Sequence, residues 1–189
     1  MDFSVDVKQQ ELIALAKTIA EKEIAPRALR IDKSGVMDEE LLEILKESGM
    51  TQLSVPKEYG GAGIDLLTGA LISEQLSKGC AGVATICAAN SLASFPILFA
   101  GSDMQKRDLF DCLNRGGMAC FALTEPGAGS DAGAVSCRAE KVEGGYILNG
   151  TKCFITNAPI ADKITLFANT REGGGIGGLT VFLVDADTK

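Results

Sequence analysis

The residues between Phe121 and Asp131 are of the types that hold a phosphorylated cofactor. They read Phe-Ala-Leu-Thr-Glu-Pro-Gly-Ala-Gly-Ser-Asp and follow an apolar segment that predicts a short strand. Gly127 and Gly129 have no Cβ, so the backbone there can expose its N–H groups and approach an anion closely. Ser130 adds a hydroxyl beside them, and Thr124 can point another hydroxyl at a flat, polar ring. This layout suits a cofactor with a ring and a phosphate that lies across a strand end.

An ordinary surface turn explains this glycine run equally well, because G-x-G-S occurs in many loops. Two nucleotide motifs are excluded. The chain contains no G-x-x-x-x-G-K-[ST], so it has no P-loop. The G-x-G-x-x-G spacing also fails, because the third glycine is missing and Val135–Lys141 predicts a strand where that motif needs a helix.

A second cluster, Asn149–Asn157, reads Asn-Gly-Thr-Lys-Cys-Phe-Ile-Thr-Asn. Cys153–Thr156 predicts a strand, whose alternation would place Phe154 and Thr156 on the same face. An aromatic ring beside a hydroxyl could hold a flavin ring by packing and one hydrogen bond. Taken alone, an ordinary strand with a core phenylalanine and an exposed threonine is the better explanation.

Composition excludes several classes of protein. The chain has 189 residues, of which 46% are hydrophobic and 23% charged, as in a folded globular protein. A net charge of −7 argues against binding nucleic acid through a basic face. Histidine is absent, so neither a Ser-His-Asp or Cys-His arrangement nor a histidine-bearing zinc site can form, and we predict no metal site. The six cysteines lack a C-x-x-C pair, which predicts reduced, mostly buried thiols in a reducing compartment, the cytoplasm.

The first part of the chain predicts helices. Apolar residues recur at helical spacing from Leu12 onward, and Pro26 should kink or end that helix. Asp38 is a plausible N-cap for a second helix, which Gly49 would follow. The apolar stretch Cys80–Ala100 predicts a buried helix rather than a membrane span, because it contains several polar residues and a proline. We therefore expect an α-helical domain over residues 1–115.

The second part, residues 116–189, predicts strands joined by glycine-rich turns. The expected strands are Met118–Thr124, Ala134–Val142, Tyr146–Asn149, Cys153–Thr156, Ile164–Asn169 and Leu179–Val184. The fold class is thus α+β, an N-terminal all-α helical bundle followed by an incomplete, antiparallel, β-barrel-like domain. The last apolar strand is followed directly by Asp185–Lys189, so we expect the sequence to stop inside a domain.

The order of these features closely resembles the acyl-CoA dehydrogenase family of flavoproteins. Helices come first, then Leu-Thr-Glu-Pro-Gly-Ala-Gly-Ser-Asp after a strand, then Asn-Gly-Thr-Lys-x-Phe-Ile-Thr-Asn after a glycine hairpin. The resemblance covers essentially the whole chain, and short-chain, butyryl-CoA-type members look nearest. It implies FAD as cofactor, an acyl-CoA substrate oxidised to trans-2-enoyl-CoA, an electron-transfer flavoprotein as partner and a homotetramer.

The resemblance also implies roles for individual residues. Thr124 would hydrogen-bond the pyrimidine edge of the flavin, and Thr156 would donate toward flavin N5. Gly129 and Ser130 would meet the phosphate, with Ser130 also near the CoA of the substrate. Phe154 stands where the family often has tryptophan, which keeps an aromatic face but loses the indole N–H. The residues placed against the cofactor are Phe121, Leu123, Thr124, Gly129, Ser130, Phe154, Ile155 and Thr156.

The chain departs from the family in length. Family members add a C-terminal helical domain that supplies the catalytic glutamate, and no residue here matches that position, so we assign no catalytic residue. Glu125 is better explained as a carboxylate that holds the turn. We expect this chain alone to be inactive and to bind FAD weakly. A non-catalytic flavin- or CoA-binding or assembly module on the same fold is the alternative, and an oxidase or monooxygenase ranks lower.

Overall fold

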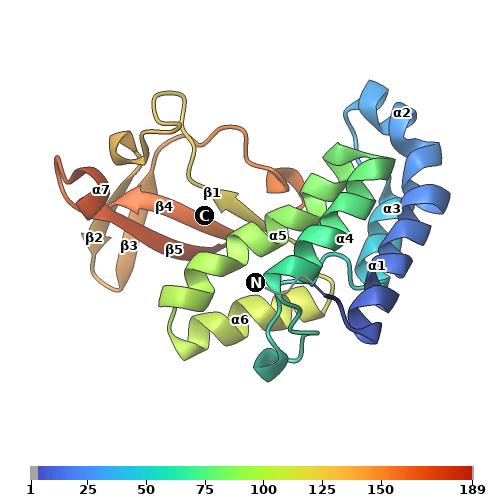
Figure 1. Ribbon diagram of the computed structural model, residues 1–189. Coiled ribbons are helices and arrows are strands. Elements are labelled where there is room, and N and C mark those ends of the chain that lie inside the picture. Colours follow the sequence, from blue (N-terminus) through green and yellow to red (C-terminus); the bar gives the residue numbers. More distant parts are fainter. Residues whose placement is uncertain (1–3, 189) are drawn as a thin grey trace. The chain divides into compact units, whose positions relative to one another are not determined.

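A computed structural model of the chain describes residues 4–188. The chain divides into two compact units, Met1–Ser91 and Leu92–Lys189. This division falls inside helix α5 (Ala81–Ala100), whereas the change from helix to strand comes later, between α6 (Asp103–Asn114) and β1 (Ala119–Ala122) (Figure 1). The predicted α+β class, with helices preceding strands, is confirmed.

Aspartates start several helices of the first unit. Asp6, Asp38 and Asp65 each accept a hydrogen bond from a backbone N–H in the first turn that follows, which satisfies a donor that the helix leaves open. Asp38 is therefore the N-cap that the sequence predicts, and Gly49 follows the helix with a φ of 77°. Asp6, Asp38 and Asp65 begin α1 (Val7–Ile19), α3 (Glu39–Glu47) and α4 (Leu66–Gly79), whereas α2 (Ala25–Ser34) follows Ile24, whose side chain makes no capping bond.

Pro26 changes the helix without ending it. Because proline has no N–H, the usual bond to the preceding turn is missing. The chain passes through a π-helical turn, Ala20–Ile24, and continues as α2 with Pro26 in its first turn. The predicted end of the helix at Pro26 is therefore wrong, because the helical backbone continues into α2, and a kink there stays a prediction.

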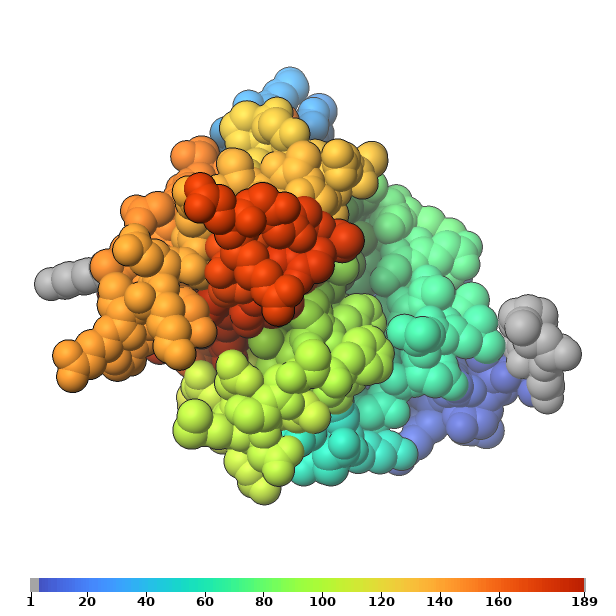
Figure 2. Space-filling view, turned by 90° about the vertical axis from the view of Figure 1, so that its left-hand side faces the viewer, coloured from blue at the N-terminus to red at the C-terminus, as the bar shows by residue number. Residues whose placement is uncertain are grey.

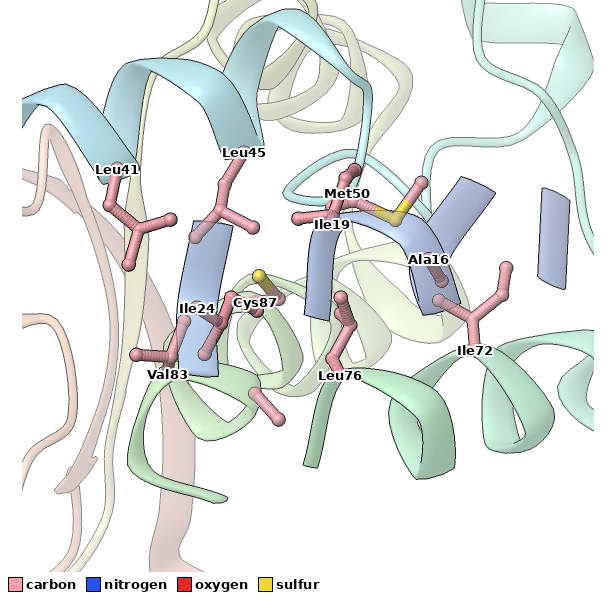
Figure 3. Close-up of a cluster of buried hydrophobic side chains, with 11 residues drawn as sticks. Ala16, Ile19, Ile24, Leu41, Leu45, Met50, Ile72, Leu76, Val83 and Cys87 are labelled. Atoms are coloured by element: carbon pink, nitrogen blue, oxygen red, sulfur yellow. The ribbon is translucent and has the colours of Figure 1, made fainter. Parts of the chain in front are cut away.

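The core of the first unit lies where these helices meet (Figure 3). Side chains of α3 in that view point toward those of α1, the π-helical turn and α4. Full burial of a leucine or isoleucine contributes about 1.5–3 kcal/mol, so this cluster holds the unit together. Its buried members are Ala16, Ile19, Ile24, Leu41, Leu45, Met50, Ile72, Leu76, Val83, Ala84 and Cys87.

Among residues 4–188, one helix, α5, is long and apolar enough to cross a membrane, judged by length and composition alone. That test is also met by core helices, and the arrangement favours this second explanation. Val83 and Cys87 belong to the core of the first unit, and the buried Asn90 side chain donates to the Thr51 carbonyl at 2.9 Å. The predicted helix over this stretch is therefore present, with a buried polar group satisfied inside the protein.

Strand β4 (Lys163–Asn169) is the centre of the sheet in the second unit. One of its edges pairs with β5 (Leu179–Asp185) in antiparallel register, Ile164 opposite Val184. Its other edge pairs in parallel with β1 and then, at Asn169, with β2 (Arg138–Val142). The hairpin of β2 and β3 (Gly145–Asn149) completes the sheet. Figure 2 shows this unit from the side of the glycine-rich loop, drawn in red, that contains the short helix α7 (Gly175–Gly178).

Three details of the expected sheet are wrong. The sheet is mixed rather than antiparallel, because the long connection Gly150–Asp162 brings β4 back parallel to β1. Cys153–Thr156 forms no strand, because Phe154 and Asn157 have positive φ values of 56° and 70°. The strand expected from Ala134 begins only at Arg138, after a short 3-10 turn at Ala132–Ala134.

We predict opposite effects for two glycine-to-alanine changes on α4. A Cβ at Gly79 would lie 2.8 Å from the Ala20 carbonyl oxygen and 2.9 Å from the Ile24 Cβ, so Gly79→Ala should destabilise the protein by about 1–3 kcal/mol. A Cβ at Gly69 would meet only the Ile64 Cδ1, at 3.8 Å, so Gly69→Ala should stabilise by up to about 1 kcal/mol. Urea unfolding measures both, and equal effects would contradict the close approach of α4 to the π-helical turn.

Candidate functional site

The two sequence motifs lie side by side along β1. The backbone N–H of Cys153 donates to the Thr124 carbonyl at 3.0 Å, just beyond the end of the strand. Lys152 Nζ donates to the Leu123 carbonyl at 2.9 Å, and the Asn157 side chain donates to the Ala119 carbonyl at 3.1 Å. The segment Lys152–Asn157 is therefore held to β1 and its continuation largely through side chains rather than through a β-ladder.

Glu125 is the carboxylate that joins these segments. Its Oε1 accepts from Lys152 Nζ at 2.7 Å and from the backbone N–H of Cys137 at 2.9 Å. Its Oε2 accepts from the backbone N–H and the hydroxyl of Ser136, at 2.7 and 2.6 Å. Only 2% of its side chain and 10% of the Lys152 side chain are exposed. Glu125 has a structural role as predicted, but its carboxylate connects separate stretches of the chain rather than holding the glycine turn, which backbone bonds close.

The surroundings of Glu125 favour its ionised form. Burial by itself raises the pKa of the carboxyl group, because it removes the charge from water. Hydrogen bonds from Lys152, then from the Ser136 hydroxyl and the two backbone N–H groups, outweigh burial and lower the pKa to about 2. Glu125 thus stays charged at neutral pH and is unsuited to exchange protons there.

The glycine turn after Glu125 has open space in front of it. The turn is closed by reciprocal backbone bonds between Glu125 and Ala128, at 3.0 and 3.1 Å. A Cβ at Gly127 or Gly129 would meet nothing within 4 Å, and neither residue has a positive φ. Gly150 differs, because a Cβ there would lie 2.7 Å from the Cys137 Cα. Among residues 4–188, no contact requires glycine at position 129, whereas a ligand that approaches the backbone would.

The hydroxyls that the sequence singles out are available to a ligand. Within residues 4–188, the hydroxyls of Thr124, Ser130 and Thr156 make no hydrogen bond with the protein. The Ser130 and Thr156 residues are exposed, and Thr124 is half-buried. Their convergence on a single ring stays a prediction, but each is free to donate or accept.

Phe154 is the most unusual residue of the site. It is 94% exposed and has a φ of 56°, a left-handed conformation that bulky residues rarely adopt. Such strain costs about 1–3 kcal/mol and persists only where the surroundings impose it. The alternation predicts that Phe154 and Thr156 share one face of a strand. That prediction is wrong, because no strand forms here. The ring is instead presented outward by a loop, and an exposed aromatic ring suits packing against a flat cofactor.

Two other predicted residues have packing partners inside the protein, and a third is half-buried. The Phe121 ring packs on the ring of Phe167 from β4, with centroids 4.9 Å apart. Leu123 packs against a cluster of buried residues that includes Val135 and Ala168. Ile155 is half-buried, and its carbonyl accepts from the Ala158 N–H at 3.2 Å. These residues are placed to support the site, and their contact with a cofactor stays a prediction.

Sequence reasoning missed Lys152 and Asn157, the residues that fix the second motif. A signal for Lys152 was available. Glu125 is the only charged residue between Arg115 and Asp131, and Lys152 is the only one between Asn149 and Pro159. Two isolated, opposite charges in otherwise uncharged runs are typical of a buried pair, because charges are rarely buried alone.

The described residues hold no group of three or more His, Cys, Asp or Glu side chains placed to bind a metal ion. All six cysteines are free, four of them buried, and Cys80 and Cys153 are half-buried. The groups that this site offers to a ligand are the three hydroxyls, the open glycine turn and the exposed ring of Phe154.

We predict that Glu125 contributes stability above pH 5 that is lost in acid. The pKa of Glu125 is about 2 in the folded protein, below the ordinary 4.5. The stability that Glu125 contributes is therefore fully present above pH 4.5 and disappears as the pH falls toward 2. Glu125→Gln should cost roughly 3 kcal/mol at pH 7, and the difference from the unmodified protein should shrink steadily below pH 4.5. Denaturant unfolding at several pH values measures it.

The control for this prediction is Glu172→Gln. Glu172 pairs with Arg138 at 3.5 Å, but its side chain is 91% exposed, so the change should alter the unfolding free energy by less than about 1 kcal/mol. A pH-independent effect of Glu125→Gln would contradict the assignment of a buried, ionised carboxylate.

We predict that Phe154→Asn stabilises the protein. Asparagine tolerates positive φ better than other non-glycine residues, and removal of a ring that is 94% exposed sacrifices little packing. The unfolding free energy should rise by about 1 kcal/mol. Phe154→Ala is the control, since it removes the ring without favouring positive φ and should give no such gain. A loss of stability with asparagine would mean that the ring makes stabilising contacts.

Comparisons with known proteins agree with this arrangement. Residues 6–117 match the family model of the acyl-CoA dehydrogenase N-terminal domain, and residues 120–189 match that of the middle domain. The chain is 44% identical over 183 residues to a 3-(aryl)acrylate reductase from Clostridium sporogenes, covering 95% of this chain and 48% of that protein. It is 38% identical over 181 residues to the mitochondrial short-chain specific acyl-CoA dehydrogenase of Rattus norvegicus, covering 95% of this chain and 44% of that one.

A solved structure is similarly close. The butyryl-CoA dehydrogenase from Megasphaera elsdenii is 38% identical and superimposes with a TM-score of 0.91, covering 100% of this chain and 51% of that one. The chain spans about half the length of these relatives. Both family models fit in the expected order, and the residues of both motifs meet along β1. The chain therefore belongs to the acyl-CoA dehydrogenase family.

Proposed function

We propose that this chain provides the flavin-holding part of an oxidoreductase that acts on the α,β bond of a short-chain acyl-CoA. The reaction in the dehydrogenating direction yields a trans-2-enoyl-CoA, a step of the β-oxidation type. The observation that carries the proposal is the meeting of two motif segments along β1, bonded at Thr124 and Leu123. Together they present three available hydroxyls, an open glycine turn and an outward aromatic ring.

The residues present fit FAD as the cofactor, which when bound would supply the hydride acceptor. The hydroxyl of Thr124 would donate to the pyrimidine edge of the ring, and that of Thr156 to N5. Hydrogen-bond donors at these positions favour the charge that reduction places on the ring. Gly129 and Ser130 would bind the diphosphate with a backbone N–H and a hydroxyl, and Phe154 would pack against the ring. Support for FAD comes from these groups and from the family.

The direction of the reaction has two candidates. Similarity to the short-chain specific and butyryl-CoA dehydrogenases favours removal of hydrogen from an acyl-CoA. The 44% identity to the 3-(aryl)acrylate reductase favours a second candidate, reduction of a conjugated double bond. Residues that bind the ring and its diphosphate serve both directions equally, because they do not contact the carbons that gain or lose hydrogen. An electron-transfer flavoprotein is the electron partner we propose for the dehydrogenating direction.

We predict that single hydroxyl deletions weaken FAD binding. Thr124→Val and Ser130→Ala should each raise the dissociation constant of FAD about 5- to 10-fold, since a lost hydrogen bond is worth about 1 kcal/mol. Phe154→Asn should weaken binding as well, although it stabilises the fold. Thr18→Val is the control, because the Thr18 hydroxyl already donates to the Ala14 carbonyl within α1. Quenching of flavin fluorescence measures the constants.

Assays of the intact gene product separate the alternatives. Dye reduction that depends on butyryl-CoA supports the dehydrogenase, and oxidation of a reduced dye by an aryl acrylate or an enoyl-CoA supports the reductase. Bound FAD without either activity would favour a non-catalytic binding or assembly module on the same fold. A protein that binds no FAD would overturn the proposal.

A further inference from the structure

We propose that Glu125 and Lys152 are positioning residues that set the relative placement of the two cofactor-contacting segments before the cofactor binds. This inference rests on the proposed function, because it assigns the buried pair a role in FAD binding. Neither side chain is proposed to touch the cofactor. Both act through the backbone that carries Thr124 on one segment and Phe154 and Thr156 on the other.

Lys152 is bonded to the segment that carries Thr124. Its ammonium group donates both to Glu125 Oε1, at 2.7 Å, and to the Leu123 carbonyl, at 2.9 Å. Leu123 and Glu125 are the two neighbours of Thr124 in the chain, so Lys152 binds on both sides of that residue. The next residue, Cys153, donates its N–H to Thr124 itself. The first cofactor segment is thus fixed to the second at three consecutive residues.

These bonds hold a strained stretch of backbone in place. Between Lys152 and Asn157 the chain contains Phe154 in a left-handed conformation, with its ring 94% exposed. Asn157, at the other end, is also left-handed and donates to the Ala119 carbonyl at 3.1 Å. The exposed ring contributes little packing of its own, so the anchors at the two ends must impose the conformation. Lys152 is the anchor nearer to Phe154.

The buried pair of Glu125 and Lys152 can be compared with the ion pairs of another buried lysine, Lys163. Replacing a buried ion pair by apolar residues of similar size is often neutral or stabilising, so burial of the pair is weak evidence for a role in stability alone. Lys163 offers a contrast in the same unit. It is similarly buried, 12% exposed, and pairs with Asp108 at 2.7 Å and with Asp185, and among residues 4–188 its side chain forms no ion pair with either cofactor segment. A positioning role predicts that these two lysines differ in their effect on FAD binding.

The experiment compares Lys152→Met, Lys152→Arg and Lys163→Met in the intact gene product. Lys152→Met keeps an unbranched side chain, one atom shorter, but removes the donor, and it should raise the dissociation constant of FAD about tenfold and alter the visible spectrum of the bound flavin. Lys152→Arg keeps the charge and the donors and should recover most of the affinity. Lys163→Met should lower the melting temperature without changing the dissociation constant or the spectrum.

A second measurement does not depend on how the variants fold. Amide hydrogen exchange of the unmodified protein without FAD should already be slow at Cys137 and Cys153, whose N–H groups are bonded to Glu125 and Thr124. Slow exchange that develops only after FAD is added would show that the cofactor, not the ion pair, assembles the segments, and would overturn the inference.

The outcomes separate this inference from the proposed function. Unmodified protein that binds no FAD contradicts the function. Unmodified protein that binds FAD, with Lys152→Met and Lys163→Met affecting its affinity equally, leaves the function intact and contradicts the positioning role.

Discussion

The site depends on the complete satisfaction of one buried carboxylate. Glu125 is removed from water, and a charge in that position is costly unless it is paired and hydrogen-bonded. Four donors meet it, from Lys152, from both groups of Ser136 and from Cys137. Because these donors come from separate stretches of the chain, none of them can move far without exposing the charge to an apolar interior. The geometry of the site is therefore a consequence of electrostatics rather than of a regular sheet.

Hydrogen bonding in the ladder explains why this part of the molecule is irregular. Strand β1 pairs with β4 along one edge only, so carbonyl groups on the other edge need donors. A further strand could supply them, but it would turn its side chains alternately inward and outward. The segment Lys152–Asn157 supplies these donors with two side chains and one backbone N–H. Its own backbone is therefore not held in an extended conformation, and two of its residues have a left-handed conformation. The outward position of Phe154 follows from that choice.

Much of the fold could be predicted from the sequence because it depends on local signals. The cap at Asp38, the glycine after α3 and the glycine-rich turn between β2 and β3 each follow from residue chemistry over a few positions. The parallel pairing of β1 with β4 could not be predicted, because it depends on how a long connection returns across the sheet. The loop at Phe154 was mistaken for a strand for a related reason, since alternation of residue types does not report a positive φ. Residue types at the site were recognisable, but the bonds that join its two halves link positions 27 and 29 residues apart.

The central position of β4 has a consequence for how the sheet forms during synthesis. Strand β1 and the hairpin of β2 and β3 emerge first, yet β1 pairs with β4, which is made later. Parallel pairing between distant segments is slow, because the loop between them must close before the contacts can form. We therefore expect the β4–β5 hairpin, which is local, to form early and to act as the template on which the earlier strands assemble. Until then the edge of β1 that will pair with β4 presents its backbone N–H and C=O groups to other chains, so we expect aggregation to compete with folding in this interval.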